Sequence, residues 1–212
     1  MFNLLLFAIC TTFAVGQTPE ECYECSGETW ESCAGVNHTC RISEKCVSAA
    51  SAFTQELAGI RKDSIEKVHR RCADTTLCET DFSVNFGPAS WNIMTKCGAN
   101  PTLGNEKKYK NGLKCFGCIS SPSECTKTLE CKETETMCIS ASETVAGNIM
   151  VNRGCATEAM CELREDISDV VGPVVVGQVS CCKGNLCNGS GILKSTSSVC
   201  LLLVVILPWM LP

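Results

Sequence analysis

Residues 181–188 read CCKGNLCN, and an apolar run, VCLLLVVILPWMLP at 199–212, follows shortly afterwards. Neighbouring residues on an extended strand point to opposite faces, so Cys181 and Cys182 are expected to bond to two different partners. Cys187 lies within reach of Cys182 through KGNL, whose glycine and asparagine suit a tight turn. This segment therefore predicts a small loop that closes a disulfide-rich domain.

Cysteine dominates the composition of the chain. There are 20 cysteines among 212 residues, a fraction above the roughly 8–10 % that marks a disulfide scaffold. Such scaffolds form outside the cytosol. The apolar run at 4–16 ends in the small-x-small sequence AVG. It predicts a signal peptide over 1–16, because it is shorter than the roughly 20 residues that a membrane span needs.

The C-terminal tail has the layout of a lipid-attachment signal. Small residues at 188–190 precede a polar spacer at 191–198 and the apolar run, which is the pattern of a glycosylphosphatidylinositol (GPI) signal. At about 1.5 Å per residue, the run is too short for a helix across a core of about 30 Å, and no basic residues follow it. We expect lipid attachment at Asn188, or at Gly189, with removal of 189–212. A soluble secreted protein is the alternative.

The cysteines form two clusters that follow one spacing pattern. A cysteine-free, lysine-rich stretch separates the clusters, and each opens with C-x-x-C, at Cys22 and at Cys115. Aligned from these residues, the gaps run 3, 8, 7, 6, 26, 6, 19 and 3, 7, 6, 7, 17, 6, 20, so one unit is used twice. We expect a first domain at 17–100, a linker at 101–112 and a second domain at 113–188. Neither domain can bury enough apolar surface to fold without cross-links, each of which supplies about 2–4 kcal/mol.

The segments between the cysteines indicate an all-β fold. TMCISAS at 136–142, NIMVNRGC at 148–155 and FSVNFG at 82–87 are rich in β-branched or aromatic residues. A helical pattern is present only in DSIEKVHRRC at 63–72. In the second domain, DVVGPVVVGQV at 169–179 predicts an apolar edge, or a protected edge strand because of Pro173. We therefore expect hairpins, or fingers, that extend from a disulfide knot.

This cysteine spacing resembles that of the lymphocyte-antigen-6 and urokinase-receptor family. Ten cysteines, from CFGC at 115–118 to the closing CCKGNLCN, carry the resemblance, and the terminal Asn188 is part of the signature. The resemblance implies a small, disulfide-rich all-β protein with two tandem three-finger, snake-toxin-like domains. It also implies the disulfide pairs Cys22–Cys46, Cys25–Cys33, Cys40–Cys72, Cys78–Cys97, Cys115–Cys138, Cys118–Cys125, Cys131–Cys155, Cys161–Cys181 and Cys182–Cys187.

The first domain departs from this pattern at its end. Gly98 stands where the second cysteine of the doublet belongs, and no closing cysteine follows, so both ends of one disulfide are missing together. A chain with two such domains also resembles the secreted phospholipase inhibitors of reptile serum and their vertebrate relatives. The stretches KVHRRCADTTLCETDFSVNFG at 67–87 and NGLKCFGC at 111–118 carry this second, weaker resemblance.

The sequence offers little for catalysis or for metal binding. Of its two histidines, His38 lies within NHT, and His69 is expected to be a basic surface residue among Lys67, Arg70 and Arg71. Zinc is disfavoured for the two C-x-x-C pairs, because one lies in each repeat and an oxidising compartment makes them disulfides. We therefore expect no enzyme, no catalytic residue, no metal and no cofactor. The formal net charge of −5 argues against a nucleic-acid partner.

Binding through the fingers is the function that remains, because hairpin tips on a rigid knot vary without disturbing the cross-links. The long second finger of the first domain, at 47–71, is expected to project furthest and to bind a partner, and a solvated loop without a partner is the alternative. Its third finger concentrates large apolar side chains, and packing between fingers or domains is the alternative to ligand binding for them. The candidate ligand-binding residues are Phe82, Phe86, Trp91, Ile93 and Met94.

Two hypotheses follow for the whole molecule. The first is a non-catalytic, GPI-anchored protein on the outer face of the plasma membrane that binds an extracellular protein ligand or a membrane receptor. The second is a secreted inhibitor of extracellular phospholipases, as the weaker resemblance implies. In either case Asn37, within NHT, is a predicted N-glycosylation site.

Overall fold

The computed structural model describes residues 18–57, 60–61, 64–104 and 109–189. The predicted signal peptide and all but the first residue of the predicted C-terminal signal lie outside these residues. The strands are β1 Glu21–Gly27, β2 Ala34–Thr39, β3 Glu44–Leu57, β4 Ile60–Arg61, β5 Ile65–Asp74, β6 Asp81–Asn85, β7 Ala89–Cys97, β8 Lys110–Phe116, β9 Cys118–Ser120, β10 Thr128–Lys132, β11 Met137–Val145, β12 Asn148–Ala156 and β13 Gln178–Cys182. The helices are α1 Glu158–Glu162 and α2 Arg164–Val171, with 3₁₀ turns η1 Thr75–Leu77, η2 Pro122–Glu124 and η3 Cys187–Gly189.

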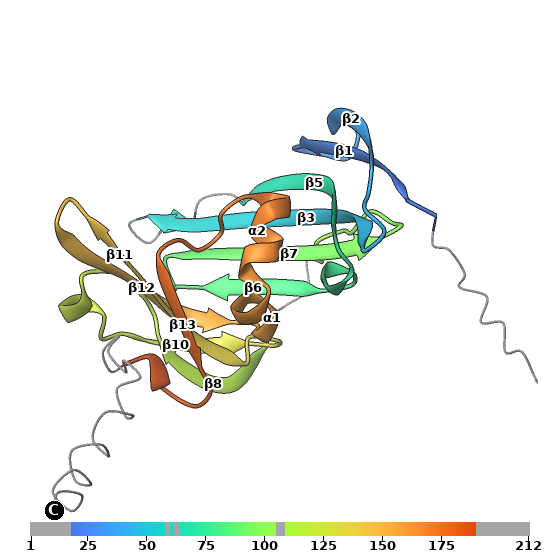
Figure 1. The fold of residues 1–212 in the computed structure, drawn as a ribbon. Coiled ribbons are helices and arrows are strands. Elements are labelled where there is room, and N and C mark those ends of the chain that lie inside the picture. Colours follow the sequence, from blue (N-terminus) through green and yellow to red (C-terminus); the bar gives the residue numbers. More distant parts are fainter. Residues whose placement is uncertain (1–17, 58–59, 62–63, 105–108, 190–212) are drawn as a thin grey trace, which may run out of the picture.

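The strands are antiparallel, and most of them join one sheet that runs through both domains (Figure 1). The order across this main sheet is β13, β11, β12, β6, β7, β3, β5, β1, β2, with β4 beside β3 and β9 beside β12. Strands β8 and β10 form a separate pair. The two tandem three-finger domains are therefore joined edge to edge, through β12 of the second domain and β6 of the first.

A glycine makes this junction possible. Cys155 pairs with Asn85 in the β12–β6 ladder. A Cβ on the preceding residue, Gly154, would lie 1.9 Å from the carbonyl oxygen of Asn85. Beyond the ladder, the backbone N–H of Thr157 donates to the carbonyl of Ser83 at 2.9 Å, and the Thr157 hydroxyl accepts from the N–H of Ser83 at 3.1 Å. The strands β12 and β6 therefore approach each other closely enough for backbone hydrogen bonds between the domains.

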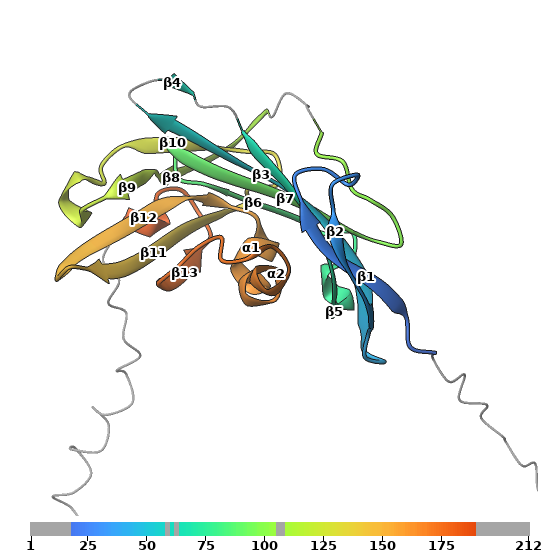
Figure 2. The same ribbon diagram turned by 90° about the horizontal axis from the view of Figure 1, so that it is seen from above.

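Two short helices lie in the third finger of the second domain, and the stretch at 169–179 runs from the end of α2 to the start of β13. The Thr157 side chain caps α1 by accepting from the N–H of Met160, and Gly172, with φ of 85°, ends α2. Ile167 and Val170 lie on one side of α2 and are buried. Figures 1 and 2 show both helices lying across one face of the main sheet at the junction. The expected edge strand begins only at Gln178, where β13 forms one edge of the main sheet, and Val174 and Val175 before it are buried in the core.

The helical expectation for 63–72 was also wrong. These residues lie largely in β5, which pairs with β3 from Phe53↔Ile65 to Glu44↔Asp74. Ten consecutive register pairs outweigh a weak local preference for helix.

Both domains contribute to one hydrophobic core. Leu77, Phe82 and Val84 from the first domain pack in one cluster with Met160 and Ile167 of the helices, and each is 0–1 % exposed. Separation of the domains would expose these side chains, so we infer that the two domains fold as one unit.

The described residues contain nine disulfide bonds, which join the same pairs that the family resemblance implies. In the second domain, Cys115, Cys131, Cys138 and Cys155 are fully buried and form a cluster of their own. These cross-links fix the bases of the fingers.

Candidate functional site

The ligand-binding prediction for the third finger of the first domain is wrong for three of its five residues. Phe82, Phe86 and Ile93 are only 1 %, 2 % and 2 % exposed. The β6–β7 hairpin lies in the middle of the main sheet, between β12 and β3, and these side chains pack in the core that the helices share. They stabilise the domain junction and are not available to a partner.

Trp91 and Met94 remain half-buried. Met94 points to the face opposite Ile93, because successive side chains alternate along a strand. Trp91 packs at the border of the core, and its ring lies 4.2 Å from that of Phe53, centroid to centroid, at an interplanar angle of 35°. Of the five predicted binding residues, Trp91 is therefore the one whose ring packs against another aromatic ring and is still partly exposed at the surface.

The register extends this cluster across three strands. Phe53 on β3 pairs with Trp91 on β7 and with Ile65 on β5. Directly paired residues share one face of a sheet, so the three side chains form a line, which we call the apolar row. Ile65 is 55 % exposed and Phe53 is half-buried. Phe53 and Ile65 were not among the predicted binding residues, because their alignment with Trp91 depends on the register of β3 with β5 and β7.

Basic side chains continue from the apolar row along β5. Lys67, His69 and Arg71 lie on the same face as Ile65 because of the two-residue period of a strand. Arg71 donates from Nη1 to the carbonyl of Asp169 on α2 at 2.5 Å. Burial, together with the charges of Lys67 and Arg71, lowers the pKa of His69 below 6.5. The imidazole is therefore neutral near pH 7.

A groove also lies at the seam between the domains and has a volume of about 640 Å³. Glu56 and Pro88 of the first domain line one side, and Ile119, Glu124 and Leu129 of the second domain are among the residues on the other. Its mixture of acidic and apolar groups suits a protein surface more than a small-molecule cavity.

Asn188, a predicted lipid-attachment residue, has a structural role. Its side chain is 5 % exposed; Oδ1 accepts from the N–H of Phe116 at 3.0 Å, and Nδ2 donates to the carbonyls of Phe116 at 3.1 Å and Ile139 at 2.9 Å. The next residue, Gly189, has no room for a side chain, since a Cβ would lie 2.3 Å from the Phe116 ring. Attachment at either residue stays a prediction, as does the glycan on Asn37, which lies on the exposed strand β2.

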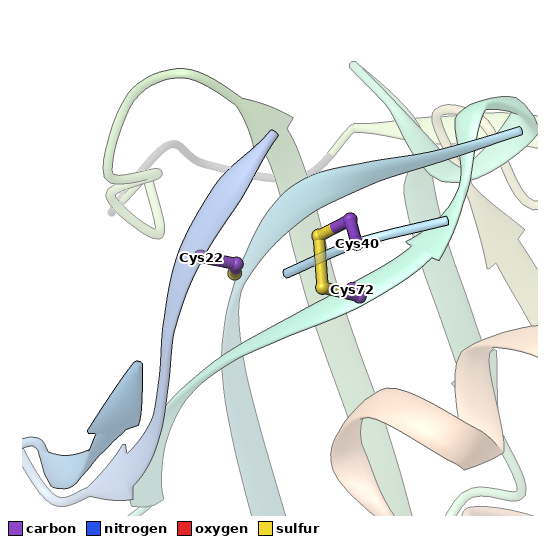
Figure 3. Close-up of side chains that lie close together, drawn as sticks. All are labelled: Cys22, Cys40 and Cys72. Carbon is purple, nitrogen blue, oxygen red and sulfur yellow. A yellow bond between two sulfur atoms is a disulfide. The ribbon is translucent and has the colours of Figure 1, made fainter. Parts of the chain in front are cut away.

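Two groups of cysteine sulfurs have the proximity of metal ligands. In one, the sulfurs of Cys22, Cys40 and Cys72 lie within 4.8 Å of one another. Figure 3 shows Cys40 and Cys72 joined by their disulfide beside Cys22, and Cys22 is bonded to Cys46. A metal ligand must be a thiolate, so these atoms form the disulfide knot of the first domain.

Residues 113–188 match the family of snake toxins and toxin-like proteins. The matched segment is the second domain, with its five disulfides and its terminal Asn188. The second domain is therefore similar to snake toxins and toxin-like proteins, which agrees with the three-finger resemblance of its cysteine spacing.

Two relatives extend this three-finger match over both domains. Phospholipase A2 inhibitor NAI of Notechis ater is 28 % identical over 179 residues, covering 76 % of this chain and 86 % of the relative. A phospholipase A2 inhibitor of the gamma type from Gloydius brevicaudus siniticus is 29 % identical over 181 residues, with 77 % and 86 % covered. Within the part of this three-finger chain that the structure describes, the helices fall short of the length and apolar character needed to cross a bilayer.

Proposed function

We propose that this three-finger protein is a non-catalytic inhibitor of phospholipase A2 that acts by binding the enzyme. The observation that carries the proposal is the extent of the similarity, which spans most of this chain and 86 % of each of the two inhibitors. A likeness confined to one three-finger domain would support only the fold. The proposal makes the second of the two sequence-based hypotheses the primary one.

The apolar row is the surface that we assign to enzyme binding. Interface energy concentrates in a few large apolar side chains, with tryptophan prominent among them. Trp91, Phe53 and Ile65 supply such a group at a surface where the rest of β5 is largely polar or basic. Disulfides and the shared core hold the three strands, so little conformational entropy is lost when a partner binds.

The test is a titration of several purified phospholipases A2 with the purified, oxidised protein. We expect inhibition at sub-micromolar concentration of at least one enzyme of the panel. Substitutions Ile65→Ser and Trp91→Ala are expected to weaken inhibition at least tenfold, which corresponds to about 1.4 kcal/mol. Ile42→Ser is the matched control, because Ile42 is an exposed isoleucine, at 69 %, outside the apolar row.

The substrate form separates enzyme binding from coating of the lipid. Inhibition by binding follows the ratio of protein to enzyme and persists with a monomeric substrate. If excess lipid restores the activity of the inhibited enzyme, the protein coats the lipid, and direct binding to the enzyme is rejected. A flat response across the whole enzyme panel would reject the inhibitor proposal.

A lipid-anchored binding protein is the second candidate, and the sequence pattern at 188–212 favours it. In this form the protein would bind an extracellular ligand or receptor from the outer face of the plasma membrane. Phosphatidylinositol-specific phospholipase C is then expected to release the protein from cells that express it. Recovery of a cell-bound chain with its apolar tail intact, measured by mass spectrometry, would reject the anchor.

A further inference from the structure

The two domains place a serine and an arginine at matching positions of their second fingers. In the first domain, Ser48 lies two residues after Cys46, and Arg70 lies two residues before Cys72, the cross-strand neighbour of Cys46. In the second domain, Ser140 and Arg153 have the same positions relative to Cys138 and Cys155. In both domains the serine and the arginine are direct cross-strand partners, Ser48↔Arg70 and Ser140↔Arg153. The surroundings of the two arginines are therefore directly comparable.

In the second domain this position is covered by residues 183–189, which we call the closing loop. Arg153 is only 7 % exposed and donates from Nη1 to the carbonyl of Gly189 at 3.5 Å. Asn188, near the end of the closing loop, exchanges two hydrogen bonds with the backbone of Phe116. The loop thus presents a turn, one carboxamide and one backbone carbonyl to the domain.

The first domain lacks the closing loop and has a cleft of about 520 Å³ at the corresponding place. Arg70 and Ser48 line this cleft. Tyr23, at the position that Phe116 has in the second domain, and Gly98, at the position of Cys182, line it as well. The first domain therefore has an open cleft where the second domain has its closing loop. The residues that line this cleft occupy the same positions as those around the closing loop.

Arg70 is held in position inside this cleft. Its Nε donates to the Ser48 hydroxyl at 3.0 Å, its Nη2 donates to Oδ1 of Asn100, and its guanidinium lies 5.3 Å from the centre of the Trp30 ring. Trp30 in turn donates from Nε1 to the carbonyl of Pro101 at 3.3 Å. A guanidinium has five N–H donors, so Arg70 can donate to a further acceptor. In the second domain, Arg153 donates in this way to the carbonyl of Gly189.

We propose that this cleft, which we call the open cleft, binds an exposed turn of a partner protein, in the manner in which the closing loop fills the second domain. The turn would supply a backbone carbonyl to Arg70 and an asparagine carboxamide to the backbone of Tyr23. Glu20 and Glu21 also line the cleft, and Glu20 pairs with Lys45 at 3.4 Å. Glu21 favours a turn with a basic residue, and the closing loop itself carries Lys183. The proposal goes beyond phospholipase inhibition and does not depend on it.

The probe is a disulfide-closed peptide with the sequence of residues 182–189, CKGNLCNG, added to the full secreted protein. We expect saturable binding, observed in NMR spectra as shifts of the side-chain N–H signals of Trp30 and Arg70. A peptide with alanine in place of its final asparagine is expected to bind at least tenfold more weakly. In the protein, Arg70→Lys keeps the charge but loses the planar donor set, and is expected to weaken binding at least tenfold.

Arg41→Lys is the matched control, because Arg41 is exposed and lies outside the open cleft. It is expected to leave peptide affinity unchanged. Thermal unfolding of both variants shows whether a loss of affinity reflects a loss of fold. Phospholipase inhibition is measured separately, so this proposal and the proposed function fail independently.

Several results would overturn the proposal. These are no binding up to millimolar peptide, equal affinity for the alanine peptide, or shifts confined to residues outside the open cleft. Concentration-dependent shifts of the same signals without peptide would assign the cleft to a second copy of the chain. Binding that begins only after enzymatic removal of an N-glycan from Asn37 would assign it to the glycan.

Discussion

Replacement of Asn188 by alanine is expected to lower the stability of the protein severely. The substitution removes the carboxamide that bonds to the N–H of Phe116 and to the carbonyls of Phe116 and Ile139. It leaves two to three backbone groups beneath the closing loop without partners, and each unsatisfied buried group costs about 1–3 kcal/mol. We therefore expect a loss of about 3–5 kcal/mol from the free energy of unfolding, against a typical total of about 5–15 kcal/mol.

The assay is equilibrium unfolding of the oxidised protein in guanidinium chloride, followed by tryptophan fluorescence and circular dichroism. Coincident transitions are expected, because the two domains share one core. Asn185→Ala is the matched control within the same loop: Asn185 is exposed and accepts one bond, from the N–H of Lys114 at 2.9 Å. Its loss is expected to cost about 0.5–1.5 kcal/mol.

Asn188→Asp provides the sharper comparison. The aspartate keeps an acceptor for the N–H of Phe116 but turns a second oxygen toward the carbonyls of Phe116 and Ile139, which repel it. We expect this variant to be less stable than the alanine variant, although it differs less in shape. An alanine variant within about 1 kcal/mol of the wild type, or an aspartate variant of wild-type stability, would refute the assigned hydrogen bonds.

Three further predictions concern a half-buried histidine of the first domain and two contacts between the domains. The pKa of His69 is lowered below 6.5 in the folded protein, so between its folded pKa and 6.5 the unfolded chain binds more protons, and the free energy of unfolding rises with pH in this window. His69→Gln is expected to flatten that slope in unfolding curves recorded from about pH 4 to 8, and an unchanged slope would contradict the assignment. Glu135 is 3 % exposed and accepts from the Ser83 hydroxyl across the junction at 2.8 Å. Glu135→Ala is expected to lower the free energy of unfolding by about 1–3 kcal/mol. Ser83→Ala added to this variant is expected to lower it little further, because the hydrogen bond is already lost. Gly154→Ala places a methyl group against the carbonyl of Asn85 and is expected to separate β12 from β6. The separation is measured as faster amide hydrogen exchange along both strands. Exchange as slow as in the wild type would show that the strands can accommodate the methyl group.

The frame of the fold could be predicted from local sequence spacing. The gaps between cysteines recur in both repeats, and the family resemblance to which they point implied the nine disulfide pairs that the structure contains. The spacing alone leaves many pairings open, since even eight cysteines can pair in 105 ways, and the family resemblance chose among them. The number of domains and the all-β class follow from the same pattern.

The candidate site could be predicted only in part. Trp91 was among the predicted binding residues, but Phe82 and Ile93 were equally apolar and proved to be core residues. Apolarity shows that a side chain is stable when buried, and it does not show which neighbour buries it. Phe53 and Ile65 were missed because they join Trp91 through pairings between strands that are distant in sequence.

The sequence by itself determined the repeat, because the gaps between cysteines recur in both units, and the family resemblance of these gaps implied the cross-links. Only the tertiary structure decided that the domains merge through β12 and β6, which side chains that merger buries, and that the missing loop of the first domain leaves a cleft beside Arg70. These features depend on the strand register and on close backbone approach at Gly154. Both are set when distant segments pack together, and neither has a local signal along the chain.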